Sequence, residues 1–410
     1  MATRNRKLAF TFIALALMAL IGFAILEVIL RATSEQRGNA TFLLGKRWYY
    51  LAPVGVPDEM PPVTLEPGSY RGYDPDLGWS IGRLGRGDEP NIREGNAEIY
   101  YSDVYGYRCD KQTHERAVSD WSGKPLPEID GNRYDYVCIG DSFTHGDAVL
   151  ADEAWPAQLG KILGSSVANL GVGGYGIDQA VMRYEIKNPS CDHVLLGLIS
   201  GDLERATYLI YNFTYGDVKS KPIYEFAEGR VSIFNRPAIF GDELLQEYQS
   251  GEDSSFFPRA KFTWDPALVH RSILDNSYCV RTLKSVPIWQ RDRNRPTIYQ
   301  EDGERLNYCI QILAHLKSLT SKQGAKLTVV LLGEANSFSE AGTGDNDNWA
   351  LLKSKLDATG ITWIDAAAPL YPVFKENRAA VVNAIDGVHY TPEANLKVAE
   401  IVAKQVTVVH

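Results

Sequence analysis

The chain has 410 residues, of which 45% are hydrophobic, and its 51 acidic residues outnumber 42 lysines and arginines to give a formal net charge of -9. This length and composition suit one large folded domain or two smaller ones. The acidic excess argues against nucleic acid as a partner, because phosphate binding requires a basic surface. No Cys-x-x-Cys or His-Glu-x-x-His pattern occurs, so the sequence predicts no metal site and no cofactor.

The N-terminal stretch determines the expected location. Arg4, Arg6 and Lys7 precede Leu8–Leu26, an uncharged run whose length as a helix, at about 1.5 Å per residue, matches a bilayer core. The basic residues favour an N-terminus that stays in the cytoplasm, so we expect a single-pass anchor in a bacterial inner membrane, with the rest of the chain in the periplasm or outside. A cleaved signal peptide and a buried core helix are the alternatives, but no Ala-x-Ala site follows the run and no polar face interrupts it.

Residues 32–133 are expected to form a tether and then a segment that wraps the main domain. Five prolines up to residue 70 disfavour long regular elements, and the Gly-, Asp- and Tyr-rich stretch from Tyr70 to Trp121 predicts turns between short strands. The five cysteines do not form a disulfide scaffold, although four of them could pair in an oxidising compartment. Cys138 is expected to be a small core residue.

From residue 134 onward, apolar runs alternate with helical segments, which predicts a parallel sheet with helices on both faces. Strands are expected at Tyr136–Ile139, Ser166–Leu170, His193–Ile199, Lys326–Leu332 and Ile361–Asp365. Helices are expected at Glu153–Leu163, Ile177–Lys187, Gly303–Lys322, Asn348–Ala358 and from Thr391 onward. An aromatic insertion at about 203–300 interrupts the alternation and is expected to lie over the carboxyl ends of the strands. We therefore divide the chain into an anchor (1–31), a tether and wrapping segment (32–133) and a catalytic domain (134–410).

Ser142 is the first candidate for chemistry. It follows the predicted strand Tyr136–Ile139 and Gly140, and open α/β sheets carry their sites at the carboxyl ends of such strands. Backbone N–H groups in the turn can also face a developing oxyanion. A lone turn serine is more often a cap or a loop hydroxyl, so the assignment depends on a partner elsewhere in the chain. His145 is too near Ser142 along the chain to be that partner, and we expect it at a helix start or on the surface.

The partner is expected near the C-terminus, in Asp386-Gly-Val-His389. A carboxylate three residues before a histidine can orient the imidazole and stabilise its protonated form, which a serine nucleophile requires. The alternative is a turn histidine beside a helix-capping aspartate. Thr391 as N-cap, with Pro392 at the first helical position, predicts the start of the last helix.

Taken together, Gly140-Asp-Ser-Phe-Thr144, Asn169-Leu-Gly-Val-Gly-Gly174 and Asp386-x-x-His389 resemble the motif blocks of the SGNH (GDSL-type) hydrolase superfamily, over residues 134–202 and 303–406. The anchor and the turn Tyr101–Arg108 more weakly resemble membrane-anchored bacterial members associated with extracellular polysaccharide. The resemblance implies a three-layer α/β/α sandwich with a five-stranded parallel sheet of flavodoxin-like type. It also implies ester hydrolysis or acyl transfer through an acyl-serine.

The resemblance also implies a role for each motif residue. Ser142 would be the nucleophile, His389 the general base and then acid, and Asp386 the carboxylate that orients it. The backbone N–H groups of Ser142 and Gly174 would bind the oxyanion.

The block after the third strand departs from the family pattern. The family places an oxyanion-binding Asn in a Gly-x-Asn-Asp-like block, whereas this chain reads Ile199-Ser-Gly-Asp202, with Gly201 at the Asn position and only Asp202 matching. Loss of one oxyanion donor typically costs about 100- to 1,000-fold in turnover. Arg205 or a residue of the insertion is the expected replacement.

Two hypotheses follow. The first is a membrane-anchored serine esterase or O-acyltransferase, acting on O-acyl groups, in particular acetyl esters, of a cell-surface or extracellular polysaccharide. The second is a catalytically reduced SGNH-type protein that binds or assembles glycans, suggested by Gly201 and by the aromatic insertion. The insertion's rings either stack on sugars or form a small core of their own. The sequence does not specify the acyl group, the sugar, hydrolysis as against transfer, or the oligomeric state.

Overall fold

The computed structural model describes residues 2–37, 40–43, 46–49, 67–88, 99–128, 130–211, 219–250, 253–259, 272–293, 297–299, 301–335, 349–384 and 386–408. The chain divides into two compact units, one made of 1–60, 210–219 and 240–295 and the other of 61–209, 220–239 and 296–410. The predicted boundaries of anchor, tether and catalytic domain stay predictions, and we describe each unit by itself.

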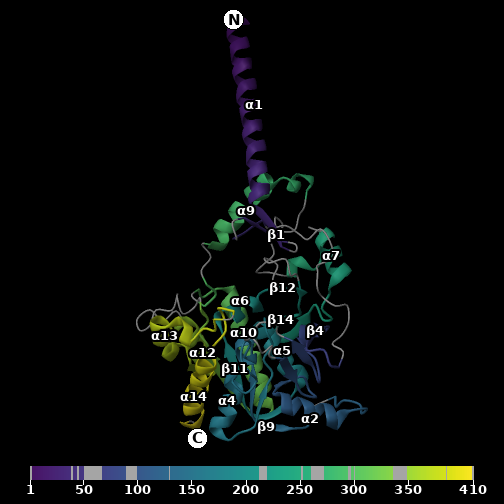
Figure 1. Cartoon of the computed structure of the whole chain (residues 1–410), viewed down its shortest axis with the longest axis vertical. Coiled ribbons are helices and arrows are strands. Elements are labelled where there is room, and N and C mark those ends of the chain that lie inside the picture. Colours follow the sequence, from purple (N-terminus) through teal and green to yellow (C-terminus); the bar gives the residue numbers. More distant parts are fainter. Residues whose placement is uncertain are drawn as a thin grey trace. The chain divides into compact units, whose positions relative to one another are not determined.

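The second unit is built on a five-stranded parallel sheet (Figure 1). Its strands are β9 (Arg133–Ile139), β10 (Val167–Asn169), β11 (Ser190–Leu198), β16 (Lys326–Leu331) and β17 (Thr362–Asp365). They lie in the order β10-β9-β11-β16-β17. Numbered along the chain, that order is 2-1-3-4-5, the flavodoxin-like arrangement. All five predicted strands and the predicted fold class are therefore confirmed.

Helices cover both faces of this sheet, and each face has its own apolar cluster. One layer contains α5 (Ile177–Lys187), α10 (Glu304–Lys322) and α12 (Ala350–Thr359). The other contains α4 (Trp155–Leu163), α13 (Ala367–Glu376) and α14 (Pro392–Val408), with the single turn η4 (Arg378–Ala380) after α13. Alternate residues of β9 enter opposite clusters, Val137 on one face and Cys138 on the other, because side chains alternate along a strand. A strand buried on both faces is apolar throughout, which explains why the sequence pattern was clear.

The segment before the sheet belongs to the same unit. Short strands joined by turns were predicted there, and the structure pairs them antiparallel. The hairpin is β4 (Arg71–Asp74) with β5 (Gly78–Ile81), and the small sheet is β6 (Arg86–Asp88), β7 (Ile99–Ser102) and β8 (Arg108–Cys109). Helix α2 (Lys111–Trp121) follows and was not predicted, although Asp110 caps it by accepting from the Thr113 N–H at 2.8 Å. Buried Tyr70 and Tyr107 join the segment to the sheet's apolar cluster.

The predicted insertion contributes regular elements to both units. In the second unit it forms α6 (Ser200–Ala206) and the hairpin β14 (Ile223–Ala227) with β15 (Arg230–Phe234). The remaining elements are β12 (Ile210–Tyr211), β13 (Lys219–Ser220), α7 (Gly241–Ser250), η2 (Phe257–Arg259), η3 (Ile273–Asn276) and α9 (Tyr278–Arg293). Several of its aromatic residues, among them Phe213, Tyr215 and Trp264, lie outside the described residues.

The first unit begins with α1 (Ala2–Thr33), followed by three short antiparallel strands, β1 (Ser34–Arg37), β2 (Ala40–Leu43) and β3 (Lys46–Tyr49). Within α1, the stretch Ala9–Thr33 contains an 18-residue window with a mean hydropathy of 2.7 and is long and apolar enough to cross a membrane. The predicted apolar helix is confirmed as a helix, and its membrane and orientation stay predictions. Each of the five cysteines is free, and Cys138 is fully buried, as predicted.

Candidate functional site

A tight turn presents Ser142 at the carboxyl end of β9. Gly140 has a φ of +151°, and a Cβ atom there would lie 2.6 Å from the Gly197 carbonyl oxygen, so only glycine fits. Asp141 then caps the single helical turn α3 (Ser142–His145), accepting from the Phe143 N–H at 2.9 Å. Ser142 is thus the first residue of a helix at the edge between the first and third strands, where the sheet order reverses.

The structure brings Ser142 together with His389 and Asp386. The Ser142 hydroxyl donates to His389 Nε2 at 2.8 Å, and His389 Nδ1 donates to Asp386 Oδ2 at 2.5 Å. We assign the proton to Nδ1 because a carboxylate can only accept. Asp386 also accepts from the backbone N–H groups of Val388 and His389, at 2.9 and 3.1 Å. These bonds fix the carboxylate, so the three side chains form a continuous chain of hydrogen bonds.

The loop that carries His389 is held at both ends. Val382 and Tyr390 form an isolated antiparallel bridge, and the His389 carbonyl accepts from the Asn383 N–H at 2.7 Å. The following helix α14 has the predicted cap, since Thr391 Oγ1 accepts from the Ala394 N–H at 3.1 Å. The imidazole therefore stands on a fixed loop between the sheet and a capped helix.

Electrostatics favour protonation of His389. Burial alone lowers the pKa of this imidazole, but the hydrogen bond to Asp386 and the carboxylates of Asp147 and Asp141 outweigh burial, so its pKa lies above the usual value. Burial raises the pKa of Asp386, but the hydrogen bonds from His389 and from the Val388 N–H reverse this, and the net pKa is lowered. Asp386 thus stays ionised while His389 accepts a proton, as a general base and its orienting group require.

Arg205 lies beside Ser142. From α6 its Nη1 donates to Asp141 Oδ2 at 2.9 Å, to Asp202 Oδ1 at 2.7 Å and to the Tyr175 carbonyl at 3.2 Å. Asp141 Oδ2 is also 3.4 Å from the Ser142 hydroxyl. Burial, followed by the neighbouring Asp141 carboxylate, raises the pKa of Asp202 well above its usual value. One guanidinium therefore bridges two buried carboxyl groups next to the Ser142 hydroxyl.

The two glycines predicted to take part occupy different positions around Ser142. Gly201 is the second residue of α6, and a Cβ atom there would lie 3.3 Å from Arg205 Nη2. The guanidinium thus fills the space into which an Asn side chain at this position would begin. Gly174 has a φ of +81° in the loop after β10. That loop packs on α3, because a Cβ atom at Gly171 would lie 2.8 Å from His145 Cα.

A second buried network behind Ser142 was not predicted. His145 is fully buried at the end of α3, so the surface position expected from the sequence is wrong. The Tyr70 hydroxyl donates to His145 Nε2 at 2.5 Å, and His145 Nδ1 donates to the Asp147 carboxylate. Asp147 also forms an ion pair with Arg71, whose Nη2 is 3.2 Å from Asp147 Oδ2. Burial lowers the pKa of His145 to about 3, with the Arg108 guanidinium acting in the same direction. His145 therefore stays neutral. The negative charge of the Asp147 carboxylate raises the pKa of His389.

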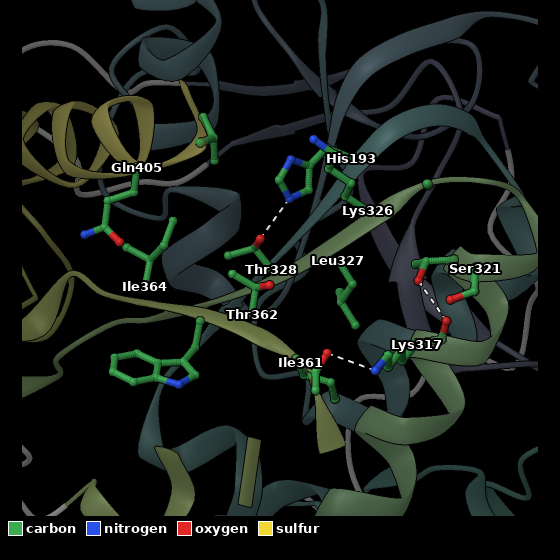
Figure 2. Close-up of a pocket in the computed structure, with 15 residues that line it drawn as sticks. His193, Lys317, Ser321, Lys326, Leu327, Thr328, Ile361, Thr362, Ile364 and Gln405 are labelled. Atoms are coloured by element: carbon green, nitrogen blue, oxygen red, sulfur yellow. Dashed lines mark hydrogen bonds between the residues drawn. The ribbon is translucent and has the colours of Figure 1, made fainter. Parts of the chain in front are cut away.

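A cavity of about 290 Å³ opens elsewhere, at the amino ends of β16 and β17 (Figure 2). His193 and Thr328 face each other in it, with Nε2 and Oγ1 2.8 Å apart. Ser142 lies at the opposite, carboxyl ends of the strands, so this cavity is not the site described above. Among the described residues, no group of three His, Cys, Asp or Glu side chains is placed to hold a metal ion.

No protein-family model and no curated protein matches the chain. Among solved structures, a member of the lipolytic G-D-S-L family from Veillonella parvula is 13% identical with a TM-score of 0.35, covering 66% of this chain and 97% of that one. An acetylxylan esterase from Geobacillus stearothermophilus is 12% identical with a TM-score of 0.32, covering 68% of this chain and 96% of that one. Likenesses this distant carry no argument about activity.

The strand order and the position of the motif blocks at the carboxyl ends of the strands are those that the sequence resemblance implies. The chain has a three-layer α/β/α fold with a flavodoxin-like strand order. The fold alone does not assign an activity, which depends on the side chains at the site.

Proposed function

We propose that this chain is a serine-dependent hydrolase or transferase of O-acyl esters, with Ser142 as nucleophile, His389 as general base and acid, and Asp386 as the orienting carboxylate. The observation that carries the proposal is the continuous hydrogen-bond chain, at 2.8 Å from Ser142 to His389 and 2.5 Å from His389 to Asp386. Serine nucleophiles need both bonds, one to remove the proton and one to hold the base in the correct tautomer.

In the first half-reaction, Ser142 Oγ attacks the acyl carbonyl carbon while His389 Nε2 takes the hydroxyl proton. The bond between the acyl carbon and the alcohol oxygen then breaks, and His389 returns the proton to the departing alcohol. The product is an ester on Ser142 and a free hydroxyl on the substrate. The depressed pKa of Asp386 keeps a negative charge beside the imidazolium that forms during this step.

In the second half-reaction, His389 activates the acceptor that removes the acyl group. If water is the acceptor, the outcome is hydrolysis, and if a sugar hydroxyl is the acceptor, it is acyl transfer. The two outcomes share every residue named above. A competition between water and acceptor sugars, measured on one acyl-enzyme, distinguishes them.

Arg205 is the group we propose in place of the missing Asn. It lies beside Gly201 and bonds to Asp141, whose carboxylate is 3.4 Å from the nucleophilic oxygen. A negative charge so close would oppose the oxyanion, and the guanidinium offsets it. Arg205 thus supplies positive charge on the side where the family places a neutral donor, and the Ser142 and Gly174 N–H groups remain the proposed backbone donors.

The substrate we propose is an O-acetylated polysaccharide at the cell surface or outside it, with α1 as the membrane anchor. The support for this finer assignment is the combination of the triad geometry with an apolar N-terminal helix of membrane-spanning length. The second candidate function, a glycan-binding protein with little turnover, is favoured by the single observation that Gly201 supplies no donor side chain.

The experiment that tests the proposal uses the full chain in detergent, incubated with p-nitrophenyl acetate. We expect an acetyl adduct in the intact mass, located on Ser142 by peptide mapping, and release of nitrophenolate. Ser142→Ala and His389→Ala should abolish both signals.

Thr328→Val is the matched control, because it removes another hydroxyl that is 2.8 Å from a histidine Nε2 and should leave both signals unchanged. Absence of an adduct and of turnover with acetylated polysaccharides as well would contradict the esterase proposal. Glycan binding that persists in Ser142→Ala would then support the second candidate.

A further inference from the structure

The segment formed by η3 and α9 exposes unusually large apolar side chains. Ile273 is 84% exposed, Leu283 71% and Leu274 65%, whereas the next most exposed large apolar side chain described outside α1 is Val388 at 45%. Single exposed apolar residues are ordinary, but a group of this exposure within one segment marks an interaction surface.

This segment is fixed to the C-terminal part of α1, within the first unit (Figure 1). Glu27 of α1 accepts from the backbone N–H groups of Tyr278 and Cys279, each at 3.0 Å, and from the Ser277 hydroxyl at 2.8 Å. The Glu27 carboxylate therefore satisfies the N-terminus of α9, whose unpaired N–H groups and helix dipole attract a negative charge. Two further contacts extend the attachment, from Arg31 to the Asn276 carbonyl at 2.6 Å and from the Cys279 thiol to the Phe23 carbonyl at 3.8 Å.

The point of attachment corresponds to one surface of a bilayer. The apolar stretch of α1 begins at Ala9, and a hydrocarbon core of about 30 Å takes about 20 helical residues. Counted from Ala9, the core ends close to Val28. Contacts with Phe23, Glu27 and Arg31 therefore place the start of α9 where acyl chains give way to head groups.

Aromatic and basic side chains accompany the apolar group. Two guanidinium groups lie over the Tyr278 ring, with Arg31 4.6 Å and Arg281 5.2 Å from its centroid. Lys284 follows one turn further along α9 and pairs with Asp275 at 2.7 Å. Tyrosine and basic residues beside exposed leucine and isoleucine are the composition of segments that lie at a membrane interface.

We propose that η3 and the first turns of α9 form an interfacial membrane contact, with Ile273, Leu274 and Leu283 inserted between the lipid head groups next to the end of α1. The partner is the lipid bilayer itself, on the side opposite the N-terminus. The inference rests on the proposal that α1 spans a membrane and is independent of the chemistry at Ser142. Contact through η3 and α9, in addition to α1, would hold the first unit against the membrane. A single flexible linker after α1 would not restrain it in this way.

The test uses the full chain carrying the photoreactive residue benzoylphenylalanine at one position, reconstituted into vesicles of phosphatidylcholine and phosphatidylglycerol. After irradiation, intact mass and lipidomic analysis of the digest identify what each position has reached. We expect lipid adducts from positions 273 and 283. The controls are positions 118 and 396, because Val118 and Leu396 are also exposed helical apolar residues, at 42% and 39%, and no lipid adduct is expected there.

Lipid adducts at 273 and 283 but not at the controls would support the proposal. Adducts to a second copy of the chain in place of lipid would overturn it and indicate self-association. An absence of lipid adducts at 273 and 283, in a chain that resists extraction by alkaline carbonate, would also overturn it. An intact mass that lacks α1 would show that α1 is cleaved and is no anchor, which would also overturn the proposal. The acetyl adduct on Ser142, measured on the same sample, tests the esterase proposal separately.

Discussion

Two regions of the sheet hold the same contact, a histidine Nε2 that is 2.8 Å from a side-chain hydroxyl. At the carboxyl ends of the strands the pair is His389 with Ser142, and at the amino ends it is His193 with Thr328 (Figure 2). Their surroundings differ. Ser142 begins a helical turn beside the carboxylates of Asp386, Asp141 and Asp147. Thr328 lies inside β16 between two paired strands, in a cavity whose described lining residues include two lysines and no carboxylate.

The difference is the reason why we propose Ser142, and not Thr328, as a nucleophile. His389 has a carboxylate on its other nitrogen and a raised pKa. Ser142 follows a strand end, where backbone N–H groups are not all used in sheet pairing. The backbone on either side of Thr328 pairs with the neighbouring strands of the sheet, and its position provides no comparable place for an oxyanion. The following predictions test each of these differences.

Removal of the base should have the largest effect. His389→Ala deletes the group that takes the Ser142 proton, and the loss in kcat is expected to be on the order of 10⁶-fold, as for other serine enzymes. Steady-state kinetics on p-nitrophenyl acetate measure this loss. Activity within tenfold of the native enzyme would show that another group serves as the base.

Removal of the orienting charge should have the next largest effect. Asp386→Asn keeps the shape of the side chain but favours the wrong imidazole tautomer, and we expect a loss in kcat of roughly 10⁴-fold. The pKa of His389 should also fall, because the hydrogen bond that His389 donates to Asp386 is the strongest influence that raises it. Nuclear magnetic resonance titration of the imidazole provides this second readout, and an unchanged pKa would count against the orienting role.

Arg205 should matter less than the triad. Arg205→Gln removes the charge beside Asp141 and is expected to lower kcat by about 100- to 1,000-fold. In the double variant Gly201→Asn with Arg205→Ala, the Asn side chain gains the space that the guanidinium filled, and part of the lost activity should return. If kcat of the double variant is no higher than that of Arg205→Ala alone, the proposal that Arg205 takes the place of the missing Asn is wrong.

The midpoint of the pH profile of kcat/KM should lie moderately above the ordinary pKa of a histidine. His389 must be neutral to act as base, and its pKa is raised, so kcat/KM should fall as the pH decreases through a midpoint above about 6.5, by about tenfold for each further unit. Asp386→Asn should move this midpoint to lower pH. A midpoint near 3, where buried His145 titrates, would point to the other histidine.

The smallest effect is expected at the opposite end of the sheet. Thr328→Val removes the hydroxyl opposite His193 and should leave turnover unchanged. Because one hydrogen bond is lost, the free energy of unfolding measured in urea should fall by about 1 kcal/mol. Loss of turnover at constant stability would break the comparison and direct attention to the cavity.

Much of the sheet was predictable because its strands are buried on both faces. The runs around Val137, Leu195 and Val329 are continuously apolar, and helices of ordinary length separate them, so periodicity and spacing agree. The positions of Ser142, Asp386 and His389 were predictable because the motifs that carry them are local in sequence. Their catalytic roles stay predictions.

The features that the sequence did not predict depend on contacts between distant residues or on very short elements. α3 has four residues, too few for a periodic pattern. The burial of His145 depends on Tyr70 and Arg108, which come from the antiparallel segment well before it in the chain. The hairpin β14–β15 was also missed. Its strands are joined by a tight turn in which Glu228 and Gly229 both adopt positive φ.

The proposed nucleophile and its proposed base are 247 residues apart in the chain, with consequences for the protein's synthesis. At about 5 to 20 residues per second, His389 leaves the ribosome roughly 12 to 50 seconds after Ser142. During that interval the serine is an ordinary hydroxyl, because neither Asp386 nor the loop before α14 exists beside it. Under the proposed mechanism, a chain that ends before His389 has no base for Ser142 and should form no acyl-serine, so acylation would await nearly complete synthesis.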